Sequence, residues 1–134
     1  PFLNTLYVDI KHHDREKHKQ LTGVGNDIIM ANLKRLDRSD FTFHLHLRFP
    51  LIPGINDDDE NLQAIISIAE SHDRVNDLEI LPYHRLGTAT YSLLGRKYHP
   101  GDLDTPTEAY LKERLTFMNK QNHSLRLKVG SGYL

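Results

Sequence analysis

Two hydrophobic periods alternate along the chain, and their order restricts the fold more than any single motif does. Apolar residues at every second position indicate strands with one buried face, which are expected at 6–11, 41–48, 78–82 and 125–129. Apolar residues at three- and four-residue spacing indicate helices with one buried stripe, which are expected at 26–36, 57–69 and 106–118. Strands and helices that alternate in this way are typical of parallel βαβ units.

The length of the chain limits the size of this fold. At 134 residues, we expect a single α/β domain over residues 1–134. A complete eight-unit barrel needs about 250 residues. The parallel βαβ units are therefore expected to form either a small open sheet or a piece of a barrel.

Several residues predict where the helices begin and end. The polar segment 12–20 is expected to form a short helix that ends near Gly23, and Asn26 occupies the N-cap position of the next helix. Asn56 is expected to cap the following helix. Thr105 is expected to cap the last helix, because the proline after it suits the first helical position. The buried stripes are expected to be Ile29, Leu33 and Leu36; then Leu62, Ile65, Ile66 and Ala69; then Leu111, Leu115 and Met118.

Two segments lack a clear period. Pro50 and Pro53 cannot donate to a strand ladder, so the second strand is expected to end at Arg48 and residues 49–56 to form a loop. Residues 83–104 are also expected to be irregular. A loop of that length inside a compact domain is usually functional.

The composition excludes several classes of function. The formal net charge is -1, and the basic residues are spread along the chain, so we expect neither a nucleic acid nor a membrane as partner. The chain contains no cysteine, which excludes disulfides and iron–sulfur ligation by this chain. No apolar run reaches the roughly 18 residues that span a bilayer, so a cytoplasmic location is expected.

Polar side chains follow the ends of the three main strands. In the first strand, Asp9 and Lys11 share a face with Tyr7, because successive side chains alternate between faces. Arg48 ends the second strand and His84 follows the third. Parallel strands end at one edge, so these groups are expected to converge on a charged small molecule. An ion pair that reaches solvent is the simpler explanation for Asp9 and Lys11 alone.

Other clusters of chemistry-bearing residues give weaker signals. His44 and His46 lie two residues apart on one strand face, as metal ligands do, but no nearby carboxylate or third histidine completes a set, so no metal site is expected. His12, His13 and His18 are expected to be solvated surface residues. The sequence contains no Walker loop and no Gly-x-Gly-x-x-Gly motif.

A longer pattern connects many of these residues. It comprises Asp9-Ile10-Lys11-His12, then His18-x-x-Leu21-Thr22-Gly23-Val24-x-Asn26, then Arg48-x-Pro50-Leu51-Ile52-Pro53-Gly54-Ile55-Asn56-Asp57, then Leu81-Pro82-Tyr83-His84-Arg85-Leu86-Gly87. In this order, over nearly the whole chain, the pattern resembles the activating enzymes of glycyl-radical enzymes, of which pyruvate formate-lyase activating enzyme is the best-known member. It corresponds to the carboxyl-terminal half of that family's catalytic domain.

The resemblance implies a fold and a chemistry. The expected fold is about half of a partial (βα)6 TIM-like barrel of the radical S-adenosylmethionine superfamily. Such enzymes hold a 4Fe-4S cluster on a loop with three cysteines. One electron from the cluster cleaves S-adenosylmethionine to methionine and a 5′-deoxyadenosyl radical, which removes a hydrogen from a glycine of the partner enzyme. The implied partners are a glycyl-radical enzyme and a flavodoxin or ferredoxin-type reductant.

The resemblance also implies roles for individual residues. Asp9 and Lys11 are expected at the ribose and methionine end of S-adenosylmethionine, with Arg48 in the same polar pocket. Asp9 and the Tyr7 carbonyl would lie near a monovalent-cation site. The loop 21–26 and the residues after the third strand would face the partner enzyme. Adenine is expected to be lined by Pro50, Leu81 and His84.

The three cluster cysteines of the family are missing from this chain. We therefore interpret it as a fragment that lacks the cysteine-bearing amino-terminal half and expect it to be inactive alone. Its exposed edge strand at 6–11 invites pairing with another copy. Two alternatives remain, a non-catalytic interaction domain and a self-sufficient α/β nucleotide-binding module with Asp9, Lys11 and His84 as ligands.

Overall fold

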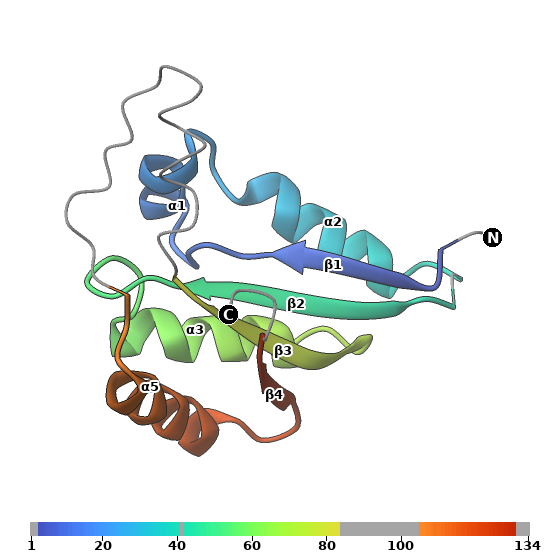
Figure 1. Cartoon of the computed structure of the whole chain (residues 1–134). Helices are drawn as coiled ribbons and strands as arrows, with labels where there is room; N and C mark the ends of the chain where they lie inside the picture. The colour runs from blue at the N-terminus through green and yellow to red at the C-terminus, as the bar shows by residue number, and fades with distance from the viewer. Residues whose placement is uncertain (1–2, 41, 84–104, 131–134) are drawn as a thin grey trace, which may run out of the picture.

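The computed structural model of the chain describes residues 3–40, 42–83 and 105–130. The strands of the described part form one parallel sheet in the order β1 (Thr5–Asp9), β2 (His44–Leu51), β3 (Val75–Pro82) and β4 (Arg126–Val129). The helices are α1 (Arg15–Thr22), α2 (Asp27–Asp37), α3 (Asp59–Glu70) and α5 (Glu108–Gln121), as Figure 1 shows. The prediction of an α/β fold built from parallel βαβ units is therefore confirmed.

One face of the sheet carries the hydrophobic core. Alternate residues of β2 are buried on this face, namely Leu45, Leu47, Phe49 and Leu51. They belong to one cluster with Leu33 of α2, Met118 of α5 and the predicted stripe of α3, which is at most 1% exposed. The helices therefore cover this face, and the polar residues of β2 lie on the opposite face. No helix in the described ranges is long and apolar enough to cross a membrane.

Strand β2 runs to Leu51 and does not end at Arg48, so the predicted boundary was wrong. The Ile10 amide donates to the Arg48 carbonyl, and Pro50, two residues later, faces the same side, where β1 has already ended. Proline has no amide proton, but at this position β1 offers no carbonyl that could accept one. Pro50 therefore costs the ladder no hydrogen bond. On the other side, the Tyr83 amide still donates to the Leu51 carbonyl.

Two predicted helix caps differ from the structure, whereas the predicted N-cap position of Asn26 is confirmed. Asn26 is the N-cap residue of α2, but its side chain makes no capping hydrogen bond. Helix α3 is capped by Asp58 and not by Asn56, and α5 is capped by Thr107 and not by Thr105. Asn26 and Asn56 are buried instead, and their amides bind backbone groups elsewhere in the chain.

Candidate functional site

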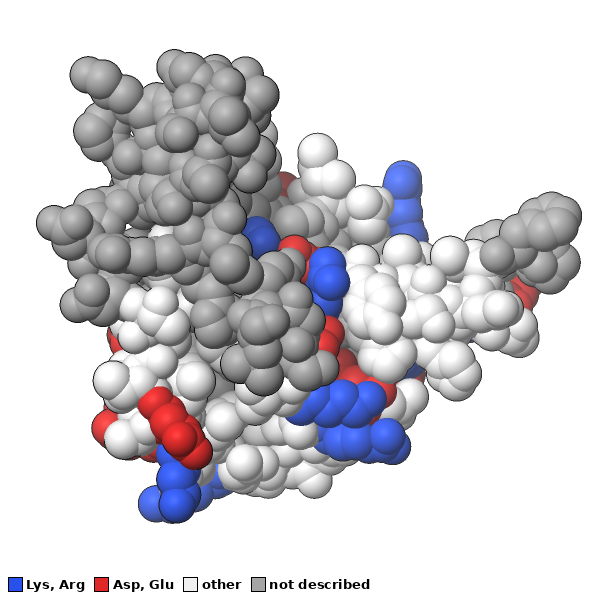
Figure 2. Space-filling view, in the orientation of Figure 1, with Lys and Arg blue, Asp and Glu red and all other residues white. Residues whose placement is uncertain are grey.

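The sheet face opposite the core carries rows of polar and charged side chains. In the register of the sheet, one row consists of Tyr7, His46, Asp77 and Arg126, and the next of Asp9, Arg48, Glu79 and Lys128. Acids and bases therefore alternate between neighbouring strands, an arrangement that stabilises cross-strand pairs. Figure 2 shows acidic and basic side chains side by side on the face turned to the viewer. The candidate site lies where these rows approach the carboxyl ends of the strands.

Asp9 ends β1 between two cations. Arg48 Nε donates to Asp9 Oδ1 at 2.8 Å, and Lys11 Nζ donates to Asp9 Oδ2 at 3.1 Å. The three side chains are each about a third exposed, at 32% for Asp9, 34% for Arg48 and 36% for Lys11. Burial raises the pKa of Asp9, but the hydrogen bonds from Lys11 and Arg48 outweigh it, and the pKa lies below its usual value. Two cations and one ionised carboxylate leave the cluster one net positive charge.

Tyr7 adds an aromatic ring to this cluster. The Arg48 guanidinium carbon lies 5.1 Å from the centroid of the Tyr7 ring, within the range of a cation–π contact. The His46 ring stacks on the same ring with centroids 5.1 Å apart. Tyr7 is 51% exposed. The charged cluster therefore borders an aromatic surface that a ligand can reach.

An apolar wall lies one row beyond Arg48. Pro50 and Leu81 are neighbours in the register of β2 and β3, and both are half-buried. Gly130 approaches this wall so closely that an added Cβ would lie 2.5 Å from Leu81 Cδ2. The structure thus brings five predicted site residues to one end of the sheet, namely Asp9, Lys11, Arg48, Pro50 and Leu81. The sixth, His84, lies outside the described residues.

The histidines that follow β1 are not solvated, which corrects the sequence-based expectation. His12 is completely buried, His18 is 2% exposed and His13 is half-buried. His12 Nδ1 accepts a hydrogen bond from the Asp14 amide at 3.0 Å. Burial, with the neighbouring charges of His13 and Lys17, lowers the pKa of His12, so the ring is neutral at pH 7. The polar composition of this segment gave no sign that its histidines pack against the rest of the chain, where one ring nitrogen each of His12 and His18 is buried without a hydrogen-bond partner among the described residues.

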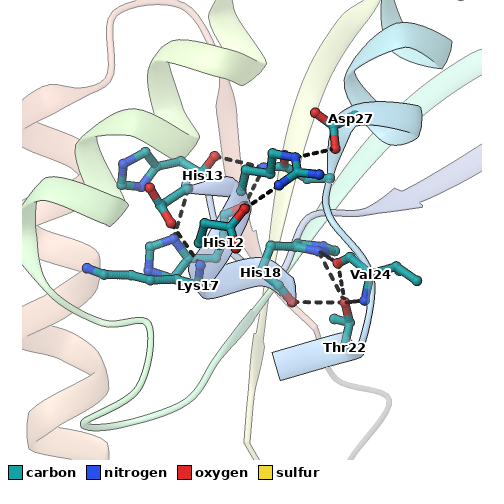
Figure 3. Close-up of polar contacts among 11 residues, drawn as sticks. His12, His13, Lys17, His18, Thr22, Val24 and Asp27 are labelled. Carbon is teal, nitrogen blue, oxygen red and sulfur yellow. Dashed lines mark hydrogen bonds and ion pairs between the residues drawn. The ribbon is translucent and has the colours of Figure 1, made fainter. Parts of the chain in front are cut away.

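The loop after α1 is braced by its own side chains (Figure 3). His18 Nδ1 donates to the Val24 carbonyl at 2.8 Å, and the Thr22 hydroxyl donates to the His18 carbonyl at 2.9 Å. Helix α1 ends, as predicted, at Gly23, which has a φ of 86°. Leu21 is 38% and Val24 65% exposed. The loop therefore presents apolar side chains to solvent on a fixed backbone.

His46 has a carboxylate neighbour that the sequence did not reveal. His46 Nδ1 lies 3.1 Å from Asp77 Oδ2, and Lys128 Nζ lies 3.0 Å from the same oxygen. His46 and Asp77 border a hollow of about 760 Å³ at the amino ends of β2, β3 and β4, away from the carboxyl-end cluster. Among the described residues, no three histidines, cysteines or carboxylates are grouped as metal ligands. The cluster is an ion-pair network.

Comparison with known proteins gives several extended similarities, although the chain matches no protein-family model. It is 45% identical over 111 residues to the 4-hydroxyphenylacetate decarboxylase activating enzyme of Clostridioides difficile (strain 630), covering 83% of this chain and 35% of that protein. It is 40% identical over 112 residues to the indoleacetate decarboxylase activating enzyme of Tractidigestivibacter scatoligenes, covering 83% and 35%. It is 37% identical over 114 residues to the pyruvate formate-lyase-activating enzyme of Staphylococcus epidermidis (strain ATCC 12228 / FDA PCI 1200), covering 85% and 45%.

Solved structures have the same fold. A domain of pyruvate-formate lyase-activating enzyme from Bacteroides vulgatus ATCC 8482 matches with a TM-score of 0.70 at 24% identity, over 96% of this chain and 68% of that chain. A radical SAM methyltransferase from Sphaerobacter thermophilus matches with a TM-score of 0.65 at 13% identity, over 98% of this chain and 36% of that chain. At these identities the likeness shows a shared fold, and the fold predicted as part of a partial TIM-like barrel is confirmed.

The chain spans about a third of the length of the first of these curated relatives, at 35%. Its match nevertheless includes most of its own residues, at identities of 37 to 45%. By these similarities, the chain belongs to the family of activating enzymes of glycyl-radical enzymes.

Proposed function

We propose that the chain is the S-adenosylmethionine-binding part of an activating enzyme that installs a glycyl radical on a partner enzyme such as pyruvate formate-lyase. One observation carries the proposal: in a chain of this family, the Asp9 carboxylate is held between Lys11 and Arg48 at the carboxyl end of β1. When bound, S-adenosylmethionine supplies the 5′-deoxyadenosyl group for hydrogen removal from the glycine. The role of this chain is to bind and orient that ligand.

The polar cluster fits the charged end of S-adenosylmethionine. Arg48 and Lys11 offer donors for the methionine carboxylate. A carboxylate has about four acceptor positions, and protein hydrogen bonds to Asp9 use two of them. The remaining positions suit an ammonium group or ribose hydroxyls. Since all three side chains are about a third exposed, a ligand can reach them without unfolding the sheet.

The apolar wall fits the other end of the ligand. Pro50 and Leu81 lie one row beyond Arg48 and offer a surface for a planar heterocycle. We propose that His84 completes this wall. A ligand that lies across both regions would place its charged end at Asp9 and its adenine at Leu81.

A monovalent cation is proposed beside Asp9 and the Tyr7 carbonyl. The Ile10 amide donates to the Arg48 carbonyl, so the even-numbered residues of β1 hydrogen-bond to β2. By alternation, the Tyr7 carbonyl points to the opposite side of β1, which is the open edge of the described sheet. A cation there would touch a carbonyl and a carboxylate, which are oxygen ligands that hard cations prefer.

The iron–sulfur cluster does not fit this chain. Cluster iron is held by cysteine thiolates, and the chain has none. We propose that the cluster and its flavodoxin or ferredoxin-type reductant act through other parts of the whole protein. The 134 residues alone are then expected to lack activity.

The function is tested in the full-length protein, prepared without oxygen. The dissociation constant for S-adenosylmethionine is measured by calorimetry, and glycyl-radical formation on the partner by electron paramagnetic resonance. Lys11→Ala is expected to weaken binding by about 1–3 kcal/mol, as for loss of a charge-assisted hydrogen bond. Lys34→Ala, on the exposed side of α2, is the matched control and is expected to bind normally. An unchanged dissociation constant for Lys11→Ala removes Lys11 from the site, and binding without a glycyl-radical signal favours a nucleotide-binding module.

We further propose that the chain alone self-associates at high concentration through β1. This strand is the edge of the described sheet. Beside it, Leu6 and Val8 form an apolar hollow with Ile29, Leu33 and Leu36 of α2. Light scattering over a concentration series tests this proposal, and a monomeric mass at the highest concentration contradicts it.

A further inference from the structure

Lys11 lies beyond the last rung of the ladder between β1 and β2. The ladder ends where the Ile10 amide donates to the Arg48 carbonyl at 2.9 Å. Nevertheless, the Lys11 ammonium is placed 3.1 Å from Asp9. A side chain that binds a ligand works only if its backbone is held, so something other than the ladder has to hold this segment.

The Asn56 side chain supplies the missing rung. Its Nδ2 donates to the Lys11 carbonyl at 2.9 Å and to the Pro50 carbonyl at 2.7 Å, and so joins the two strands where their ladder has ended. Its Oδ1 accepts from the Ile52 amide at 2.8 Å. Asn56 has no exposed surface. Only a primary amide both donates twice and accepts, so asparagine fits this position and aspartate does not.

Two further buried asparagines extend this support. Asn61 Oδ1 accepts from the His13 amide at 2.9 Å, and Asn61 Nδ2 donates to the Asn56 carbonyl. Asn26 Nδ2 donates to the carbonyls of His12 and His13 at 3.1 and 2.7 Å. The neighbourhood of His12 and His13 is drawn in Figure 3. Backbone groups of three successive residues, Lys11 to His13, are thus held by side-chain amides from the segments that begin α2 and α3.

We propose that Asn56 is a positioning residue that holds the Lys11 ammonium in the geometry required to bind S-adenosylmethionine. The inference rests on the proposed function of Lys11 and deepens it. Asn56 also holds the Pro50 carbonyl, so one amide fixes a residue of the charged cluster relative to a residue of the apolar wall. It does not touch the ligand and acts through these two backbone groups.

The test is a double-mutant cycle in the full-length protein, read by the dissociation constant for S-adenosylmethionine and by the melting temperature. Asn56→Ala is expected to raise the dissociation constant about tenfold, as typical when the partner that orients a binding group is lost. In the Lys11→Ala background, Asn56→Ala is expected to leave the dissociation constant nearly unchanged and still to lower the melting temperature. A purely structural role would lower the melting temperature alone in both backgrounds.

Asn122 provides the matched control. Its amide makes two backbone hydrogen bonds, both with Leu125, at the turn between α5 and β4. Asn122→Ala is expected to lower the melting temperature and leave the dissociation constant unchanged. If Asn56→Ala prevents folding, Asn56→Ser retains one hydroxyl donor, and a smaller rise in the dissociation constant is expected, again only when Lys11 is present.

The outcomes separate this inference from the proposed function. If Lys11→Ala leaves the dissociation constant unchanged, Lys11 is not part of the binding site and the positioning role is overturned with it. If Lys11→Ala weakens binding but neither Asn56 variant does, the site stands and the positioning role is overturned. The positioning role is also overturned if Asn56→Ala weakens binding by the same factor in both Lys11 backgrounds.

Discussion

Replacing Arg48 with alanine tests whether the side chains at the end of β1 form one supported cluster. The change removes the hydrogen bond from Nε to Asp9 Oδ1 at 2.8 Å and the cation–π contact with the Tyr7 ring at 5.1 Å. A partly exposed ion pair contributes up to about 1 kcal/mol, and a partly exposed cation–π contact about 0.5–1 kcal/mol. Lys11 still neutralises Asp9. We therefore expect the free energy of unfolding to fall by about 1–2 kcal/mol.

The matched control is Arg15→Ala. Arg15 Nε also lies 2.8 Å from a carboxylate oxygen, that of Asp27, but these side chains are 54% and 63% exposed. Because both side chains are largely exposed to solvent, the loss of stability in Arg15→Ala is expected to be clearly smaller than in Arg48→Ala. Urea denaturation of both variants at pH 7 gives the two values. Equal losses would refute the reasoning, because the partial burial and the aromatic contact of Arg48 would then contribute nothing.

Three further predictions concern neighbouring features. The pKa of Asp9 lies below its usual value of 3.8. The stability advantage of the wild type over Asp9→Asn is therefore expected to be complete above pH 3.8 and to be lost as the pH falls through the lower pKa of the folded state. Urea titrations between pH 7 and pH 3 test this expectation, and an advantage that does not change with pH contradicts it. Gly130→Ala puts a Cβ 2.5 Å from Leu81 Cδ2, so calorimetry is expected to show weaker S-adenosylmethionine binding, and unchanged affinity would separate Leu81 from the adenine. Tyr110→Phe removes the hydrogen bond that the hydroxyl donates to Asp57, and thermal unfolding is expected to show a loss of about 1 kcal/mol with no change in affinity.

The sequence predicted the fold well where burial depends on local periodicity. The alternation in β2 and the stripe in α3 follow from which side chains face the core, and that pattern is present within each segment. The end of β2 was predicted wrongly, because whether Pro50 interrupts a ladder depends on where a different strand ends. The cap of α3 was predicted wrongly for a similar reason, and Asn26, although it is the N-cap residue of α2, does not use its side chain for capping. Asn26 and Asn56 occupy cap-like positions, but distant carbonyls compete for their amides.

The residues of the candidate site also fall into some that the sequence predicted and some that it did not. Asp9, Lys11 and Arg48 were predicted because polar residues at the ends of parallel strands meet at one edge. The side-chain amides that hold the backbone after β1 were not predicted. The hydrogen bond from Asn56 to Lys11 spans 45 residues of sequence, and the one between His13 and Asn61 spans 48 residues. A signal was present in the resemblance pattern, which contains Asn56, but its position suggested a cap. Buried amides are recognised only once the backbone groups around them are known.

The order of the rows on the open face of the sheet explains why one end suits a ligand with two different parts. Asp9 and Arg48 lie in a row of charged side chains, whereas the next row toward the carboxyl ends contains Pro50 and Leu81. A ligand with a zwitterionic end and a planar end can satisfy both rows only if their spacing is fixed. The ladder does not fix this spacing at Lys11, because β1 has ended there. The Asn56 amide spans this boundary by binding the carbonyls of Lys11 and Pro50, so a change at a residue that does not touch the ligand is expected to weaken binding through Lys11.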